Sequence, residues 1–287
     1  SKYLLKKNIV VFLNDLKKNK CKYSFFSLEN GENKYNKYIP LNINKVFVLE
    51  KVFNQEISTE FKNYFDEYYT LNNPEIDINI IENYLKNGAD PDTYNKNKQT
   101  CLHLACILNK FDIAKLLLKY DADPNPEYSI NYISPLHLAV ELENDNITKL
   151  LLDNGADINS EDRIGWTPIF NASWNPNISN LKTLLKYNAD VNHKSTSKWT
   201  PLHVACNSTN NLYNNVELLI KHGANINICD LSGLTPLYLA CMRKEEDVIN
   251  ILIKHGADPN LKTNSKMTSY EFCKKHEYSF FSNLNKN

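Results

Sequence analysis

The sequence predicts an all-α solenoid, in which short helix pairs stack in a row behind a non-repeating N-terminal extension. Three observations support this fold class. Residues that can begin a helix, Thr or Ser, recur at a nearly constant spacing, and most are followed by Pro. A Leu-rich segment follows in each unit and ends at Gly, Asn or Asp, directly before an alanine. A repeat of this length is typical of proteins whose units bury a common core by stacking.

The period is visible in two separate series of residues. The helix-starting positions lie 34, 33, 33, 35 and 33 residues apart, and they are Thr100, Ser134, Thr167, Thr200, Thr235 and Thr268. The alanines behind the helix stops lie 33, 34, 33, 35 and 33 residues apart, and they are Ala89, Ala122, Ala156, Ala189, Ala224 and Ala257. Two series with one period indicate a single supersecondary unit repeated along the chain.

Residues 200–227 show what each unit encodes. Thr200 is a suitable helix N-cap because its hydroxyl can accept a free amide hydrogen of the first turn. Pro201 suits the first helical position, where its missing N–H costs nothing. After the apolar run at 218–220, Gly223 can adopt the left-handed conformation that ends a second helix. The apolar faces of one such pair are too large to bury alone, so neighbouring units must cover them.

The motifs of these units resemble those of the ankyrin-repeat family. The first-helix motif TPLH and its variants occur at 100–103, 134–137, 167–170, 200–203 and 235–238. The closing motif GADxN and its variants occur at 88–92, 121–125, 155–159, 188–192, 223–227 and 256–260. The resemblance covers residues 57–283. It implies helix-turn-helix units joined by β-turn tips, with about five full units between partial capping units, and a non-catalytic protein that binds other proteins.

We expect two parts, a non-repeat extension at 1–56 and the solenoid at 57–287. Within the extension, residues 3–16 predict a helix, four lysines at 17–22 predict a solvated helix end, and a turn signal at 29–32 allows a small hairpin. We expect the extension to pack on the open N-terminal end of the solenoid. The opening unit should have helices at 61–69 and 78–87, and Thr268 with Glu271 should form a capping box at the other end.

The composition excludes several classes of function. Lys+Arg and Asp+Glu both total 33, so no net charge attracts nucleic acid. The 7 cysteines are not clustered, which favours reduced, buried thiols and an intracellular protein, cytoplasmic or nuclear. No segment approaches the roughly 20 apolar residues that span a bilayer. We therefore expect a monomer that binds a protein partner, without nucleic acid or membrane insertion.

The residue patterns that carry catalysis or bind metals are weak. His103, His137 and His203 occupy equivalent positions in their units, so they lie on successive helices about 8–10 Å apart. One zinc ion cannot join them, because its ligands lie only about 2 Å from the metal. The chain has no CxxC pair, HExxH motif or phosphate-binding glycine loop. We expect no catalytic residue, no cofactor and no metal site, with an active site in the extension as the alternative.

The family resemblance places partner contacts on the β-turn tips before each TPLH motif and on the exposed face of the first helix. Trp166 and Trp199 precede consecutive helix caps, so we expect them to be exposed neighbours on one face, as interface anchors. The alternative is that each Trp covers only its own helix pair. The candidate partner-binding residues are Arg163, Ile164, Trp166, Trp174, Trp199, Ile133, Leu234, Met242 and Arg243.

Two local features depart from a plain repeat. The fourth unit contains two extra residues within 207–215, an insertion that we expect beside the face of Trp166 and Trp199. The segment that ends in Asn192 resembles the ankyrin segments whose asparagine some oxygenases hydroxylate. Asn192 also has a structural role in its turn, and the sequence leaves both interpretations open.

The expected function is recognition of a protein partner through a concave, turn-lined face, as an adaptor, an inhibitor or a host-directed factor. One alternative is a pathogen or viral effector, in which the ankyrin scaffold delivers a separate activity of the extension and the protein acts in the host cytosol. Another is an adaptor for ubiquitin ligation, which would need a recruiting motif beyond the repeats. Analogy at the level of the fold names no partner.

Overall fold

The computed structural model describes residues 55–64, 77–126, 130–208 and 212–278. The chain divides into two compact units, Ser1–Thr93 and Tyr94–Asn287. The expected helix at 3–16, the lysine cluster, the hairpin and the packing of residues 1–56 on the repeats fall outside the described residues, and they stay predictions.

The described part of the first unit contains two helical segments. Residues 55–64 are helical, and α3 spans Ile78–Lys86. Asp77 begins α3 by accepting a hydrogen bond from the backbone N–H of Asn79. Phe61 and Ile81 are fully buried, and the rings of Phe61 and Tyr84 lie 5.6 Å apart. The second helix of the opening unit is therefore confirmed. The first begins earlier than predicted, and the rest of its predicted range lies outside the described residues.

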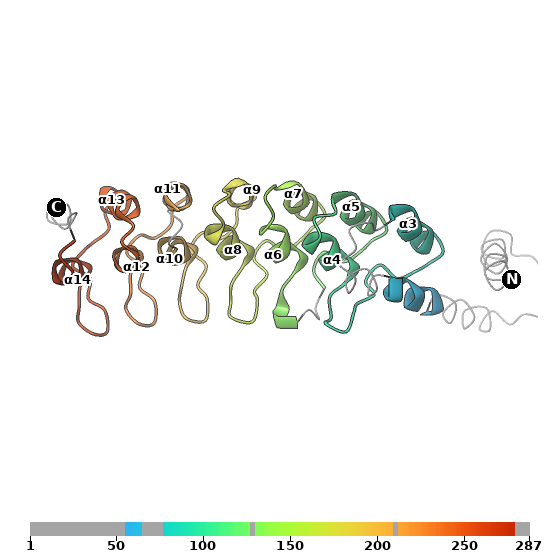
Figure 1. Cartoon of the computed structure of the whole chain (residues 1–287), viewed down its shortest axis with the longest axis horizontal. Coiled ribbons are helices and arrows are strands. Elements are labelled where there is room, and N and C mark those ends of the chain that lie inside the picture. The colour runs from blue at the N-terminus through green and yellow to red at the C-terminus, as the bar shows by residue number, and fades with distance from the viewer. Residues whose placement is uncertain (1–54, 65–76, 127–129, 209–211, 279–287) are drawn as a thin grey trace, which may run out of the picture. The chain divides into compact units, whose positions relative to one another are not determined.

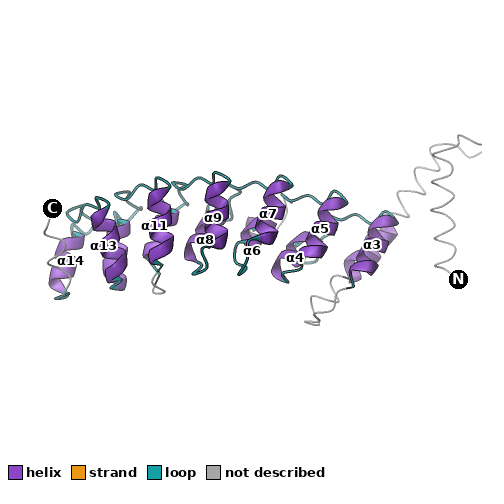
Figure 2. Ribbon diagram, turned by 90° about the horizontal axis from the view of Figure 1, so that it is seen from above, coloured by secondary structure: helices purple, strands orange, loops and turns teal. Residues whose placement is uncertain are grey.

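The second unit consists of two rows of helices (Figure 1). The first helices of the repeats are α4 (Cys101–Ile107), α6 (Pro135–Ala139), α8 (Pro168–Trp174), α10 (Pro201–Cys206), α12 (Pro236–Arg243) and α14 (Ser269–Lys275). The second helices are α5 (Phe111–Lys119), α7 (Asn146–Asp153), α9 (Ser179–Lys186), α11 (Tyr213–Lys221) and α13 (Glu246–Lys254). One short 3-10 helix, η1, spans Ile130–Tyr132. Turn loops project from the side of the first helices (Figure 1), and neighbouring repeats stand side by side (Figure 2).

The helices begin and end as the motifs predict. Thr235 accepts the backbone N–H of Tyr238, and Thr268 with Glu271 forms the expected reciprocal capping box. The stops have left-handed backbone, with φ of 84° at Gly155, 62° at Asp121 and 64° at Asn188. An Asn or Asp tolerates this conformation better than most residues with a β-carbon do, which explains both replacements of Gly.

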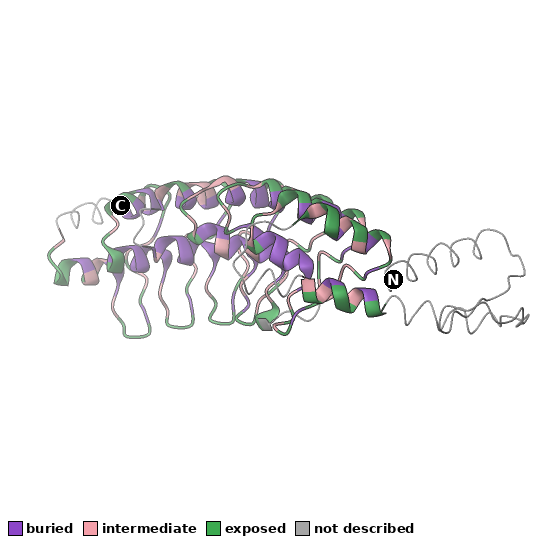
Figure 3. Cartoon of the chain, turned by 45° about the vertical axis from the view of Figure 1, so that its right-hand side comes forward, coloured by how far each residue is buried: buried purple, intermediate pink, exposed green. Residues whose placement is uncertain are grey.

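The core lies between the two rows. Figure 3 shows the first helices largely buried and the turn loops largely exposed. Leu202 of α10 and Leu219 of α11 are fully buried, and so are Leu136 and Leu151 in the α6–α7 pair. Each such side chain contributes about 1.5–3 kcal/mol relative to exposure. First helices also pack against first helices of adjacent repeats, as α8 and α12 do against α10, so stacking contributes to this burial.

A histidine links each of three repeats to the next. Nδ1 of His103 accepts the backbone N–H of Thr100 at 3.1 Å, and Nε2 lies 2.9 Å from the carbonyl oxygen of Ile133 in the following repeat. A backbone amide only donates and a carbonyl only accepts, so the proton is on Nε2. His137 and His203 repeat the arrangement, toward the carbonyls of Trp166 at 3.0 Å and Leu234 at 3.2 Å.

Asparagine side chains make a second link at the opposite ends of the repeats. The amide of Asn192 donates to the carbonyl of Gly223 and accepts the backbone N–H of Asn225. Asn125 and Asn227 make the same pair of bonds to their following repeats. Three of the closing motifs therefore hold the following repeat through both polar atoms of one side-chain amide.

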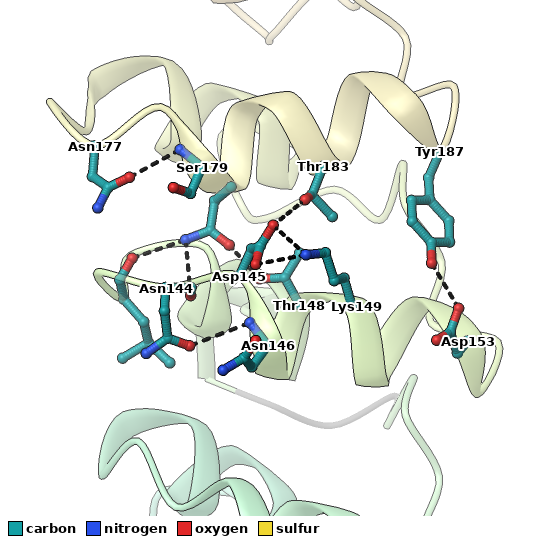
Figure 4. A network of polar contacts seen from close by, with 12 residues as sticks. Asn144, Asp145, Asn146, Thr148, Lys149, Asp153, Asn177, Ser179, Thr183 and Tyr187 are labelled. Carbon is teal, nitrogen blue, oxygen red and sulfur yellow. Dashed lines mark hydrogen bonds and ion pairs between the residues drawn. The ribbon is translucent and has the colours of Figure 1, made fainter.

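A buried polar network joins α7 to α9 (Figure 4). Asn180 is fully buried, accepts the hydroxyl of Thr148 at 2.6 Å, and donates to the carbonyl of Leu142 at 2.8 Å. Thr183 donates to Asp145, which also pairs with Lys149 at 2.8 Å. Asn215 of α11 has the same role as Asn180 of α9. Its side-chain amide donates to carbonyls at the end of the preceding first helix, α8, including that of Asn175 at 2.8 Å. These bonds satisfy carbonyls that a helix end leaves free.

The third repeat lacks the histidine link because Phe170 stands at the position that His103, His137 and His203 occupy in their repeats. Phe170 is fully buried, and the hydroxyl oxygen of Thr167 is buried without a hydrogen-bond partner among the described residues. In contrast, the hydroxyl of Thr200 lies 2.9 Å from Nδ1 of His203. The two threonines therefore differ in whether their hydroxyl is used.

This difference predicts opposite outcomes for one substitution. Thr200→Val should lower the free energy of unfolding by about 1 kcal/mol, because it removes a used hydroxyl. Thr167→Val should leave it unchanged or raise it slightly, because a methyl group replaces a buried hydroxyl without a partner. Denaturant unfolding of both variants beside the wild type measures the difference. Equal losses at the two positions would contradict the role assigned to the histidine.

Candidate functional site

The turn loops share one backbone arrangement. In each, the N–H of the first residue donates to the carbonyl of the fifth, and the N–H of the fourth donates to the carbonyl of the first, as in the bond of 2.9 Å from Ser195 to Trp199 and that of 2.8 Å from Lys198 to Ser195. We call these five-residue turns the tips. They are residues 95–99, 162–166, 195–199, 230–234 and 263–267.

Backbone hydrogen bonds tie each loop to the one before it. Thr196 donates to the carbonyl of Ile164 at 3.0 Å, and Leu231 donates to the carbonyl of Ser197 at 3.1 Å. Arg163 and Asn264 make equivalent bonds to Asn131 and Ser232. The four tips from 162–166 to 263–267 therefore form a continuous row, held in register from one repeat to the next.

Exposed apolar side chains concentrate on the tips, the adjoining turn residues and the ends of the first helices. In the described part of the second unit, Phe111 alone among the large exposed hydrophobic residues belongs to a second helix. Ile107, Trp174 and Met242 each lie seven residues after a helix cap, at the ends of α4, α8 and α12. The others lie in the turn loops, and they are Tyr94, Tyr132, Ile164 and Leu231.

The predicted partner-binding residues fall into three groups. Arg163 and Ile164 are exposed on a tip, and Trp174, Met242 and Arg243 are exposed at the ends of first helices. The Nε of Arg243 donates to the side-chain oxygen of Asn207 at 3.0 Å. Ile133 and Leu234 are only half-exposed, and their carbonyls accept the histidine links.

Trp166 and Trp199 are half-buried, where exposed anchors were expected. The ring of Trp166 stacks on Phe170 at 5.5 Å, and the ring of Trp199 stacks on His203 at 6.1 Å. Trp199 also donates its indole N–H to Asp230 of the next tip at 3.0 Å. Each Trp therefore covers the beginning of its own first helix, as the alternative interpretation predicts, because the residue four positions on presents an aromatic ring to it.

The structure adds Tyr132 and Ile107 to the surface. Tyr132 is 64% exposed, in the loop whose backbone turns through left-handed conformations at Asn131 and Tyr132. The repeat pattern does not predict its exposure, because the loop that contains Tyr132 is not one of the five tips and has a different backbone. Ile107 could have been found, because it shares the seventh position after the cap with Trp174 and Met242.

The insertion in the fourth repeat does not lie beside Trp166 and Trp199. Residues 209–211 of it lie outside the described part, but Asn215 at its end is buried against the carbonyl end of α8. Trp199 precedes α10 whereas the insertion follows it, so the two lie at opposite ends of that helix. Asn215, at the end of the insertion, is thus next to the end of α8, where Trp174 lies.

The three linking histidines have both ring nitrogens in hydrogen bonds, which assigns them a structural role. Burial lowers the pKa of His103 to about 4 and opposes the smaller effect of its bond to Ile133. Burial also lowers the pKa of His137 and of His203, against weaker contributions from the carbonyl partners and from Asp162 and Asp230. All three rings are therefore neutral at pH 7.

Other candidates for chemistry belong to the core. Cys106 and Cys206 are buried, and burial raises the pKa of both thiols. The described residues contain no group of His, Cys, Asp and Glu arranged to hold a metal ion. None of the helices described is both long and apolar enough to cross a membrane. Asn192 uses both polar atoms of its amide in the link to the next repeat, which supports its structural role.

The neutral histidines predict a loss of stability in mild acid. In the unfolded chain a histidine binds a proton below about pH 6.5, whereas in the folded chain His103 does so only below about pH 4. The full contribution of the neutral ring to the free energy of unfolding is therefore present above pH 6.5 and is lost as the pH falls. At pH 5 the loss should reach about 2 kcal/mol for His103, and His137 and His203, whose pKa values are also lowered, should add to it.

Thermal unfolding between pH 7 and pH 5 measures this loss, since Asp and Glu contribute little above pH 5. The matched control is the triple variant with His103, His137 and His203 changed to Gln, which can still reach back to the cap amide. Its stability should be lower at pH 7 but much less dependent on pH. An equal slope in both proteins would assign the effect to other groups.

Comparison with known proteins agrees with this architecture. A family model described as ankyrin repeats (3 copies) matches residues 71–162, 125–195 and 169–263. Among solved structures, the chain is similar to the ankyrin repeat domain of Bcl-3, a member of the IkappaB protein family, with 28% sequence identity and a TM-score of 0.60 over 68% of this chain and 86% of that chain. No curated protein matches the sequence. Since the family model accounts for more than half of the chain, this protein belongs to the ankyrin-repeat family.

Proposed function

We propose that the chain is a non-catalytic binding module, an adaptor or inhibitor. It binds a partner protein on the face formed by the tips and the first helices. Ankyrin repeats typically serve as scaffolds for protein–protein interaction and are typically non-catalytic. The single observation that carries the choice of face is the distribution of exposed apolar side chains, which favours this side over the second helices.

The anchors of this face are Trp174, Met242 and Ile164, which are 44%, 47% and 50% exposed. Arg163 and Arg243 stand next to two of them, and Trp and Arg are the residue types that dominate binding energy at interfaces. Trp166 and Trp199 support the face from below by fixing the tips on the helices, and they are not its main anchors.

The scaffold is ordered before binding. The tip row, the histidine links and the asparagine links hold neighbouring repeats together without a partner. A surface with fixed anchors loses little conformational entropy on association, so more of the contact energy appears as affinity. A separate activity of residues 1–56 concerns a segment outside the described part, and it stays a prediction.

The test replaces the three anchors by a small polar residue. The variant with Ile164, Trp174 and Met242 changed to Ser should bind a partner identified with the wild-type chain at least about tenfold more weakly, as expected for interface anchors. Isothermal titration measures the affinity, and thermal unfolding verifies the fold.

Phe111→Ser is the matched control, because Phe111 is 38% exposed on a second helix. Its affinity for the partner should equal that of the wild type. Undiminished binding by the triple variant, or an equal loss in the control, would place the interface elsewhere.

A further inference from the structure

The tips share a backbone but differ in the residue at their fourth position. Every residue there has left-handed backbone, with φ of 75° at Gly165 and 73° at Gly233, and of 60°, 61° and 62° at Lys98, Lys198 and Lys266. Glycine adopts this conformation without strain, whereas a residue with a β-carbon does so at a cost. Three tips therefore hold a lysine where the backbone would be more stable with glycine.

Packing explains the glycines but not the lysines. A β-carbon at Gly165 would lie 3.0 Å from the backbone nitrogen of Thr196, and one at Gly233 would lie 2.9 Å from that of Asn264. These two tips need glycine because the next tip is too close. At the other three tips a side chain is accommodated, and all three lysines are exposed.

The first residue of the tip changes together with the fourth. Asp162 and Asp230 begin the two glycine tips, and each accepts backbone N–H groups of its own turn. Neutral residues make equivalent bonds in the three lysine tips, and they are Asn95, Ser195 and Thr263. Compared with a glycine tip, each lysine tip thus has an additional positive charge at its fourth residue and no negative charge at its first, although the backbone of the turn is the same.

Further exposed lysines reinforce this charge. Lys194 precedes the tip that contains Lys198, and Lys262 precedes the tip that contains Lys266. The apolar Ile164 and Leu231, 50% and 56% exposed, lie on the glycine tips. From the third repeat to the last, the exposed apolar residues of the glycine tips therefore alternate with the lysines, and Arg163 adds a positive charge next to Ile164.

We infer that this row binds an extended segment of the partner protein in which apolar and acidic side chains alternate. The inference rests on the proposed function, and it adds the chemistry of the bound segment. Stacked helices lie about 8–10 Å apart, and a segment in the extended polyproline II conformation advances about 3.1 Å per residue with three residues per turn. The segment therefore presents one side chain to each tip at about every third residue. Carboxylates face Lys198 and Lys266, and apolar groups face Ile164 and Leu231.

The apolar residues favour a peptide over nucleic acid. A phosphate backbone would require positive charge along the whole row, but the tip at 230–234 has no basic residue and begins with Asp230. The chain as a whole has equal numbers of basic and acidic residues, which gives no general attraction to a polyanion. An acidic peptide with apolar side chains matches both kinds of tip.

The probe is a fluorescent peptide of repeating Glu-Ser-Ser-Leu-Ser-Ser, measured by anisotropy with the full chain at low salt. Variants K198Q/K266Q and K198G/K266G should bind it about tenfold more weakly, as two exposed ion pairs allow. The glycine variant should melt at the same or a higher temperature than the wild type, because its backbone strain is relieved. Binding should also weaken with added salt.

The control variant K182Q/K254Q removes the same charge from exposed positions of α9 and α13, and it should bind like the wild type. Equal losses in the control and the tip variants, or undiminished binding by the tip variants, would overturn the inference. Tighter binding of a 30-base-pair DNA duplex, lost in the same tip variants, would assign the row to nucleic acid instead. If the Ile164, Trp174 and Met242 variant loses its partner while the lysine variants keep it, the proposed function stands and only this inference fails.

Discussion

The hydrogen bonds between neighbouring repeats are the constraint on which the rest of this structure depends. A single pair of short helices cannot bury its apolar face, so each repeat is stable only against the next. The link from His137 to the carbonyl of Trp166 fixes the distance and register at the start of the first helices. Asparagines such as Asn192 do the same where the second helices end. The histidine link uses a buried ring that would otherwise lack a partner, which makes its geometry costly to change.

Residues with left-handed backbone occur at the helix stops and at the tips, and a structural reason for this conformation exists at only some of them. At the helix stops, Gly155 and Asn188 satisfy the backbone with residues that accept positive φ. At the tips, Gly165 and Gly233 are required by the closeness of the next repeat. Lys198 and Lys266 have no such structural reason, and strain held at an exposed position is characteristic of sites that bind. The same conformation thus has two structural reasons in this chain, and neither of them accounts for Lys198 and Lys266.

Two exceptions show how the repeats compensate for changes. Phe170 removes one histidine link, but its ring stacks on Trp166 and fills the core, so packing replaces a hydrogen bond. The buried Asn180 places polar atoms between α7 and α9, and it is satisfied by Thr148 and by carbonyls of the preceding loop. Buried polar groups that are fully bonded fix one register between helices, because a shifted register would leave them unpaired.

The sequence by itself determined the repeat length, the helix caps, the stops and the family, because these depend on local chemistry repeated at a fixed period. The capping box of Thr268 with Glu271 and the left-handed Asp121 follow from single residues and their neighbours. The exposure of the tryptophans could not be predicted in this way. It depends on the side chain four residues later, on which the indole ring stacks, and on the hydrogen bond that Trp199 donates to the next tip. Only the tertiary structure decided that Trp199 is held between repeats while Trp174 faces outward, since burial is a property of the stack and not of the unit.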